Sequence, residues 1–260
     1  MRISRFFERL GTKAIAFFTS LYELWALLVS TIRSITSFWF YRRQAAEQFY
    51  GFLVKTIPIS LVIAVFVGLG AFIQGRYQSA LFIPRYITIS VIFKSTILDL
   101  CPITLALVLA GKLGASLAAE LGSMKISEQI DALQSLSLDP VGFLVLPRVA
   151  AGTFMLPIIT IFANMVALFT VFFSSVVLSD WIAPAEFIKG LQHNYRPFEL
   201  YFGSIIKPAV YGFVIALIGS YFGMKTHGGA QGVGRASTNA VVAAATVIVF
   251  FNYFLGRVFL

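Results

Sequence analysis

Long blocks of apolar residues, separated by short polar segments, dominate the pattern along this chain of 260 residues. Four blocks are uncharged, and each approaches or exceeds the roughly 17–25 residues of a membrane-spanning helix: 56–75, 149–179, 208–224 and 236–256. A fifth and weaker block at 100–111 continues past Lys112 to residue 119, and it can span a bilayer if Lys112 lies near one face. Because a membrane β-barrel would show alternating segments of about ten residues, the pattern predicts five transmembrane helices.

The composition agrees with this class. Hydrophobic residues make up 58% of the chain and charged residues 12%, whereas soluble domains average about 45–50% and about 25%. The single cysteine, Cys101, excludes an intrachain disulfide and a cysteine-based zinc site, and is typical of a small buried residue. Since His193 and His227 are far apart in the sequence, we expect no metal site. The prediction is one all-α integral membrane domain over residues 1–260.

Residues 1–50 mix basic and large aromatic side chains. The aromatic residues are Phe6, Phe7, Phe17, Phe18, Trp25, Phe38, Trp39 and Phe40. On a helix, this mixture favours an interfacial position at the level of the lipid headgroups. A short first span at 14–34 is the alternative, but Glu23 near its middle would be costly in hydrocarbon. The predicted domain therefore has an interfacial helical region at 1–50 and a five-span bundle at 51–260.

The distribution of basic residues predicts the topology. Eight of the 20 Lys and Arg residues precede the first firm span: Arg2, Arg5, Arg9, Lys13, Arg33, Arg42, Arg43 and Lys55. By the positive-inside rule this end is cytoplasmic, so five spans put segments 110–147 and 226–240 inside and the C-terminus outside. The net charge of +9 is consistent with attraction of these basic residues to anionic lipid of the inner leaflet. We expect no nucleic-acid partner.

The charged segment between the second and third predicted spans has a helical pattern. Ile126, Ile130, Leu133 and Leu136 fall on one stripe of a helix. The sequence Asp139-Pro140 ends that helix, because proline disfavours helical geometry in the residue before it. A short amphipathic helix of this kind is either a solvated connector or a helix that inserts into a groove of a partner.

Two motifs resemble one family. AGKLGASLAAELGSMKISEQIDAL at 110–133, followed by DP and PRVAAG, is similar to the MlaE-type permeases of phospholipid-transporting ABC systems. GGAQGVGRASTNAVV at 228–242 resembles the loop before the last span of the same family. The resemblance implies a homodimeric permease in the inner membrane of a double-membraned bacterium, with its C-terminus in the periplasm. It also implies a phospholipid cavity, a cytoplasmic ABC ATPase, a periplasmic MCE-domain partner and, in some members, a STAS-domain protein.

The resemblance assigns roles to two segments. The segment 120–136 would be the coupling helix that docks into the ATPase, with contacts from Glu120, Lys125, Glu128, Gln129 and Asp131. The segment around Gly232, Gly234 and Arg235 would be a cytoplasmic loop with a tight turn. The chain has no G-x-x-x-x-G-K-[ST] pattern, so we expect it to bind no cofactor and to catalyse no reaction, and a partner subunit would bind and hydrolyse ATP.

Three positions relate to the transport cavity. The stretch LDLCP at 98–102 matches Arg-Glu-Leu-Gly-Pro of several relatives, so that Asp99 keeps the acid while Leu98 replaces the arginine. Lys207 matches a lysine at the start of the fourth span, and Asn252 replaces an acid in the last span. Because ionisable groups at membrane depth are costly, we expect these residues to support the cavity or its gating. In the alternative they lie at the outer boundary, with Lys207 reaching the headgroups.

Two other classes fit the sequence less well. An ion-coupled transporter or channel would show paired charges inside the membrane and related halves, whereas the charges here cluster at the ends of the predicted spans. A lipid-modifying enzyme would need a nucleophile or metal set, and the two histidines and eleven acids form no such group in the sequence.

Overall fold

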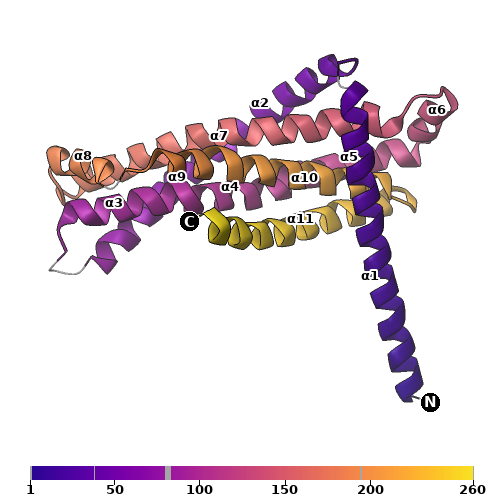
Figure 1. The fold of residues 1–260 in the computed structure, drawn as a ribbon, viewed down its shortest axis with the longest axis horizontal. Coiled ribbons are helices and arrows are strands. Elements are labelled where there is room, and N and C mark those ends of the chain that lie inside the picture. Colours follow the sequence, from indigo (N-terminus) through magenta and orange to yellow (C-terminus); the bar gives the residue numbers. More distant parts are fainter. Residues whose placement is uncertain (1, 38, 80–82, 194, 260) are drawn as a thin grey trace.

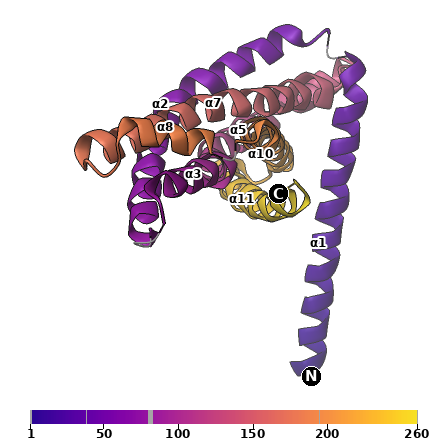
Figure 2. The same ribbon diagram turned by 60° about the vertical axis from the view of Figure 1, so that its left-hand side comes forward.

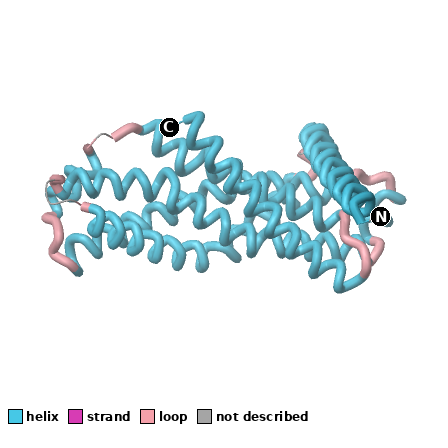
Figure 3. Tube along the Cα trace, turned by 90° about the horizontal axis from the view of Figure 1, so that it is seen from below, coloured by secondary structure: helices cyan, strands magenta, loops and turns pink. Residues whose placement is uncertain are grey.

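The computed structural model describes residues 2–37, 39–79, 83–193 and 195–259, and all regular elements in these ranges are helical (Figure 1, Figure 3). The α-helices are α1 (Arg2–Arg33), α2 (Arg42–Gln78), α3 (Arg85–Ser95), α4 (Cys101–Leu109), α5 (Ala115–Ile126), α6 (Gln129–Ser135), α7 (Leu146–Phe172), α8 (Pro184–Gln192), α9 (Pro197–Tyr201), α10 (Lys207–Met224) and α11 (Gly229–Phe259). Short η segments lie between some of them: a 3-10 turn η1 (Ser34–Ser37), and π-helical η2 (Thr96–Leu100), η3 (Ala110–Gly114), η4 (Val141–Val145), η5 (Phe173–Leu178) and η6 (Phe202–Ile206).

The prediction of five spans is confirmed. Five continuous helical stretches in the described residues are long and apolar enough to cross a membrane: Arg42–Gln78, Arg85–Ile126, Val141–Leu178, Pro197–Met224 and Gly229–Val258. Each is longer than its apolar block, because residues outside the block continue the helix. The weak block around Lys112 belongs to the second stretch, which joins α3, η2, α4, η3 and α5. The chain is an all-α membrane protein.

The N-terminal helix lies across one end of this bundle. α1 runs at a steep angle to the five long stretches, near α6 and the connection between α10 and α11 (Figure 1, Figure 2). It is not among the stretches apolar enough to span, and Phe18, Tyr22 and Trp25 remain exposed. This geometry favours the interfacial helix over a short first span. The side chains of Arg2, Arg5, Phe6, Phe7, Arg9, Lys13, Phe17 and Phe38 lie outside the described residues.

Glycine residues allow two helices of the bundle to approach each other closely. α7 packs against both α2 and α10. A Cβ atom at Gly212 of α10 would overlap the carbonyl oxygen of Gly152 in α7. Because dispersion and close backbone approach drive helix packing in lipid, where apolar attraction is weak, these two glycines fix the contact between α7 and α10.

Three π-helical segments precede prolines. η2, η4 and η6 end directly before Cys101-Pro102, Leu146-Pro147 and Lys207-Pro208. Proline has no N–H to donate to the carbonyl four residues earlier, which disturbs regular α-helical bonding. The residue before each proline bonds five residues back, as the N–H of Cys101 does to Thr96 O and that of Lys207 does to Phe202 O. Such bulges are frequent at functional sites, and Asp99 and Lys207 lie at two of them.

The prediction of one coupling helix over 120–136 is wrong. α5 ends at Ile126, and Glu128 adopts a left-handed conformation (φ 58°) before α6 begins at Gln129. The chain folds back so that Ile130 packs against Leu121 and Leu144. The predicted stripe is therefore split: Ile130 is buried, whereas Ile126 is exposed and Leu136 is 71% exposed.

The prediction of a loop at Gly232, Gly234 and Arg235 is also wrong. α11 begins at Gly229, so these three residues form its first turns. The reversal is shorter than expected and uses Gly228 and Gly229, both with positive φ. A Cβ atom at Gly232 would overlap the carbonyl oxygen of His227. Glycine at position 232 therefore lets the first turn of α11 pass close to the His227 carbonyl, so the tight turn that the sequence suggested lies at the start of a helix.

Candidate functional site

A buried lysine is the centre of the first candidate site. Lys207 has no exposed surface. It is the eleventh residue of its helical stretch, which begins at Pro197. Its Nζ donates to Oδ1 of Asp99 at 2.5 Å and to the carbonyl oxygen of Leu98 at 3.0 Å. The side chain of Lys207 is therefore directed to Asp99 inside the bundle, and not outward as the alternative of a lysine reaching the headgroups would require.

Pro102 explains why the Leu98 carbonyl takes part. It lies four residues after Leu98 and has no N–H to offer to that oxygen. Lys207 Nζ donates there instead, so the ammonium stabilises a carbonyl at the π-helical segment η2. A buried charge needs several partners to offset the cost of leaving water.

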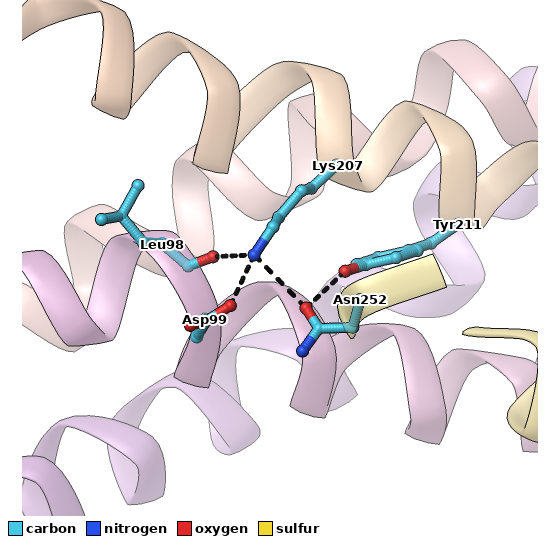
Figure 4. Close-up of polar contacts among 5 residues, drawn as sticks. All are labelled: Leu98, Asp99, Lys207, Tyr211 and Asn252. Atoms are coloured by element: carbon cyan, nitrogen blue, oxygen red, sulfur yellow. Dashed lines mark hydrogen bonds and ion pairs between the residues drawn. The ribbon is translucent and has the colours of Figure 1, made fainter. Parts of the chain in front are cut away.

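Asn252 brings the last span into the same network. Its Oδ1 accepts from Lys207 Nζ at 3.3 Å and from Tyr211 Oη at 2.7 Å. Figure 4 shows the five residues converging from the second, fourth and fifth spans. The structure thus brings together Asp99, Lys207 and Asn252, the three residues that we expect to support the cavity or its gating. It adds Tyr211, which is fully buried and which sequence reasoning missed.

Asp99 faces open space on its other side. Its side chain is 51% exposed, in contrast to the fully buried Lys207. It borders a hollow of about 340 Å³ whose lining combines amide and hydroxyl groups with apolar side chains: Ala71, Gln74, Gly75, Gln78, Val91, Ile92, Ser95, Asp99 and Leu100. The carboxylate therefore connects a buried network between spans with a hollow that suits a molecule having polar and apolar parts. In the described residues, no group of three or more His, Cys, Asp and Glu side chains could hold a metal ion.

The predicted coupling residues lie at the opposite end of the bundle, around α6 (Figure 1). Glu120 of α5 pairs with Arg148 of α7 at 2.5 Å. Arg148 is almost fully buried and also donates to the Leu144 carbonyl at 2.6 Å. Glu120 therefore fixes α5 to α7, and Arg148 is a positioning residue that the sequence reasoning did not include.

The remaining coupling residues are on the surface of the same hairpin. Lys125 Nζ pairs with Asp131 Oδ1 at 2.7 Å and thereby closes the break between α5 and α6. Glu128 and Gln129 are exposed at the turn itself. A hairpin with a charged, exposed tip is suited to binding another protein.

Polar contacts also attach α1 to this end of the bundle. Oε2 of Glu23 accepts hydrogen bonds from Tyr221 Oη at 2.8 Å and from Lys225 Nζ, at the end of α10. Further along, Ser34 Oγ donates to Asp139 Oδ2 at 2.8 Å, just before η4. α1 is therefore connected to α10, and η1, which follows α1 directly, is connected to the segment after α6.

The Glu23 contact should depend on pH. The hydrogen bond from Lys225 holds the pKa of Glu23 below its ordinary value and raises the pKa of Lys225. A lowered glutamate pKa gives a contact that is present at neutral pH and is lost as the pH falls through that pKa. A raised lysine pKa gives a contact that is lost only as the pH rises through it. The contact is therefore complete between these two values.

We expect Glu23→Gln to loosen α1 at neutral pH. Spin labels at the exposed positions Thr19 and Thr238, measured by double electron–electron resonance in nanodiscs, should give a broader distance distribution in the variant. The wild type should approach that distribution only below the ordinary glutamate pKa of about 4.3. Glu47→Gln is the control, because Glu47 pairs with Arg43 within α2. Equal distributions for Glu23→Gln and the wild type would contradict the role of this contact.

Comparison with known proteins gives consistent matches. The family described as Permease MlaE matches residues 45–258. A probable ABC transporter permease protein of Synechocystis sp. is 36% identical over 217 residues, which cover 82% of this chain and 81% of that protein. A probable ABC transporter permease protein of Rickettsia felis is 32% identical over 211 residues, covering 81% and 80%. The chloroplastic protein TRIGALACTOSYLDIACYLGLYCEROL 1 of Arabidopsis thaliana is 34% identical over 209 residues, covering 79% of this chain and 58% of that protein.

Proposed function

This chain belongs to the MlaE permease family of ABC transporters, and from that premise we propose that it is the membrane subunit of an ATP-driven phospholipid transporter. The observation that carries the proposal is the network of Asp99, Lys207 and Asn252, which joins three spans beside a hollow with polar and apolar walls. A network shared by spans is suited to change when those spans move relative to each other.

A lipid cargo is supported by the chemistry of the hollow. Gln74, Gln78 and Ser95 offer hydrogen bonds to a headgroup, while Val91 and Leu100 offer apolar contact to acyl chains. The hollow lies next to the membrane-spanning stretches, where a lipid can enter sideways from the bilayer. The name of the Arabidopsis relative contains that of a glycerolipid, which agrees with a cargo of this class.

An ABC transporter permease works with a partner ATPase. We place its binding site on the hairpin of α5 and α6, with Glu128, Gln129 and Asp131 at the contact. Closure of the ATPase on ATP would move the hairpin, and the Glu120–Arg148 pair would pass that motion to α7. Such coupling requires ATP to bind one conformation of the complex better than the other.

The assembly in this proposal contains two copies of the chain. α11 is the least covered span, with 11% of its apolar window buried. Its exposed side chains Val242, Val249 and Tyr253 form one helical stripe. This stripe is suited to pack against a second copy, so that the two hollows would form one cavity. We also propose that the chain lies in the inner membrane, with its α6 end in the cytoplasm and its C-terminus in the periplasm. The other proposed partners are an MCE-domain protein and a STAS-domain protein.

Reconstitution tests this function. The chain, its ATPase and its MCE-domain partner would be placed in proteoliposomes with deuterated phospholipid, and lipid transfer to the MCE-domain protein would be followed by mass spectrometry. We expect ATP-dependent transfer and ATP hydrolysis that responds to lipid. An assembled complex that hydrolyses ATP at the same rate with and without phospholipid, and transfers none, would refute the proposal.

A further inference from the structure

A second hollow lies between α1, α10 and α11, away from Asp99. Its volume is about 680 Å³, and its walls are almost entirely apolar. α1 contributes Leu21, Leu24 and Leu28, and α10 and α11 contribute Phe213, Leu217, Ala243, Val247 and Phe251 among others. No lining residue is shared with the hollow beside Asp99. We call this feature the α1 groove.

The α1 groove opens into a polar and basic mouth. An adjoining hollow of about 320 Å³ shares Ser20, Tyr221 and Phe222 with the groove. Its other walls carry hydrogen-bonding and basic groups: Lys225, Thr226, His227, Gly232, Arg235, Ala236 and Asn239. The charge of Lys225 is offset by Glu23, whereas Arg235 is exposed on the first turns of α11. The mouth is therefore net positive.

The order of these surfaces matches an amphiphile with an anionic headgroup. The apolar groove follows α10 and α11 inside their membrane-spanning stretches, where hydrocarbon surrounds the protein. The mouth lies at the ends of those stretches, beside α1, which crosses that end of the bundle at a steep angle (Figure 2). Basic residues at this level attract anionic lipid, and the apolar walls below them suit its acyl chains.

We infer that the α1 groove binds one anionic phospholipid from the leaflet at the α6 end, with its phosphate at Arg235 and Lys225. An acyl chain lies against Leu24, Leu217 and Val247. The lipid fills the space between α1 and the bundle, so it also holds α1 in place. This inference requires only that the chain spans a membrane, and it does not depend on lipid transport.

A photoactivatable phosphatidylglycerol tests this site. The permease–ATPase complex in nanodiscs is irradiated, and labelled peptides are mapped by mass spectrometry, with phosphatidylcholine carrying the same group in parallel. We expect labelling in α1, α10 and α11 around the groove, stronger for phosphatidylglycerol. Arg235→Glu should reduce phosphatidylglycerol labelling at least roughly fivefold, the contribution of one basic residue near an anionic surface. Arg257→Glu, at the other end of α11, is the matched control.

A second variant tests the apolar part. Ala243→Trp should fill the groove and remove labelling of both lipids there, whereas Val62→Trp on the exposed face of α2 should not. Lys207→Met should leave the labelling unchanged, so that failure of the transport site is distinguished from failure of this one. Equal labelling in the wild type, Arg235→Glu and Ala243→Trp would overturn the inference. So would efficient disulfide formation between two copies through Val247→Cys, because a second copy would then occupy the groove.

Discussion

Asp99→Asn should destabilise the protein by about 3 kcal/mol, the lower end of the range for breaking a buried ion pair. The substitution leaves the fully buried ammonium of Lys207 without its anionic partner. The lower end applies because Asp99 is 51% exposed, so part of its charge is already in contact with solvent or headgroups. The loss should appear as a lower midpoint of thermal unfolding in nanodiscs.

The double variant Asp99→Asn/Lys207→Met separates stability from function. Replacing both partners of a buried pair by groups of similar shape is often neutral for stability, so the unfolding midpoint should return towards the wild-type value. Phospholipid transfer should stay at least tenfold reduced, because neither charge remains to rearrange when the spans move. The pair Lys94–Glu199, in which both side chains are mostly buried, is the matched control. Lys94→Met/Glu199→Gln should keep transfer near the wild-type rate.

Two results would contradict this prediction. Wild-type transfer in the double variant would show that the pair serves stability alone. An unchanged unfolding midpoint in Asp99→Asn would show that the Leu98 carbonyl, Asn252 and water satisfy Lys207 without the carboxylate.

Four spans could be predicted from sequence because uncharged blocks of membrane length leave few alternatives, and the fifth could be predicted because a single charge, Lys112, interrupts its apolar block. The selection of Asp99, Lys207 and Asn252 as site residues followed from their family positions. Their partners did not, because Tyr211 resembles any other aromatic residue of an apolar span. One signal for the Leu98 carbonyl was present: Pro102 removes an N–H four residues later, which marks that oxygen as an acceptor for a distant donor.

Helix ends were predicted less well than helices. The stripe from Ile126 to Leu136 had the period of a helix, but the left-handed Glu128 divides it. The break depends on the packing of Ile130 against Leu121 and Leu144, which the sequence pattern does not show. In the same way, the glycines before Arg235 indicated a turn without giving its place, since glycine permits both a reversal and a closely packed helix end. The partner of Glu120 was missed because Arg148 is 28 residues away and directly precedes an apolar block, where it reads as a flanking charge of the span.

Glu128→Lys should reduce binding of the partner ATPase at least tenfold. Glu128 is exposed at the tip of the α5–α6 hairpin, and its side chain projects from a backbone held in the left-handed region. A reversed charge there opposes a complementary surface directly, and like charges facing each other across an interface cost several kcal/mol. Co-purification of the ATPase with the tagged chain measures the effect, and ATP hydrolysis by the complex should fall with it.

Glu128→Gly separates the side chain from the backbone. A non-glycine residue in the left-handed region costs roughly 1–2 kcal/mol, so glycine should keep the turn and raise the stability of the hairpin while removing the carboxylate. If the carboxylate contacts the ATPase, this variant binds less ATPase despite its greater stability. Asp180→Lys is the control, because Asp180 is also acidic, exposed and left-handed (φ 47°). It differs from Glu128 in its place, since it follows η5 at the α8 end of the bundle. Full ATPase binding by Glu128→Gly and Glu128→Lys would mean that this tip is a solvated connector, and the ATPase would have to bind elsewhere.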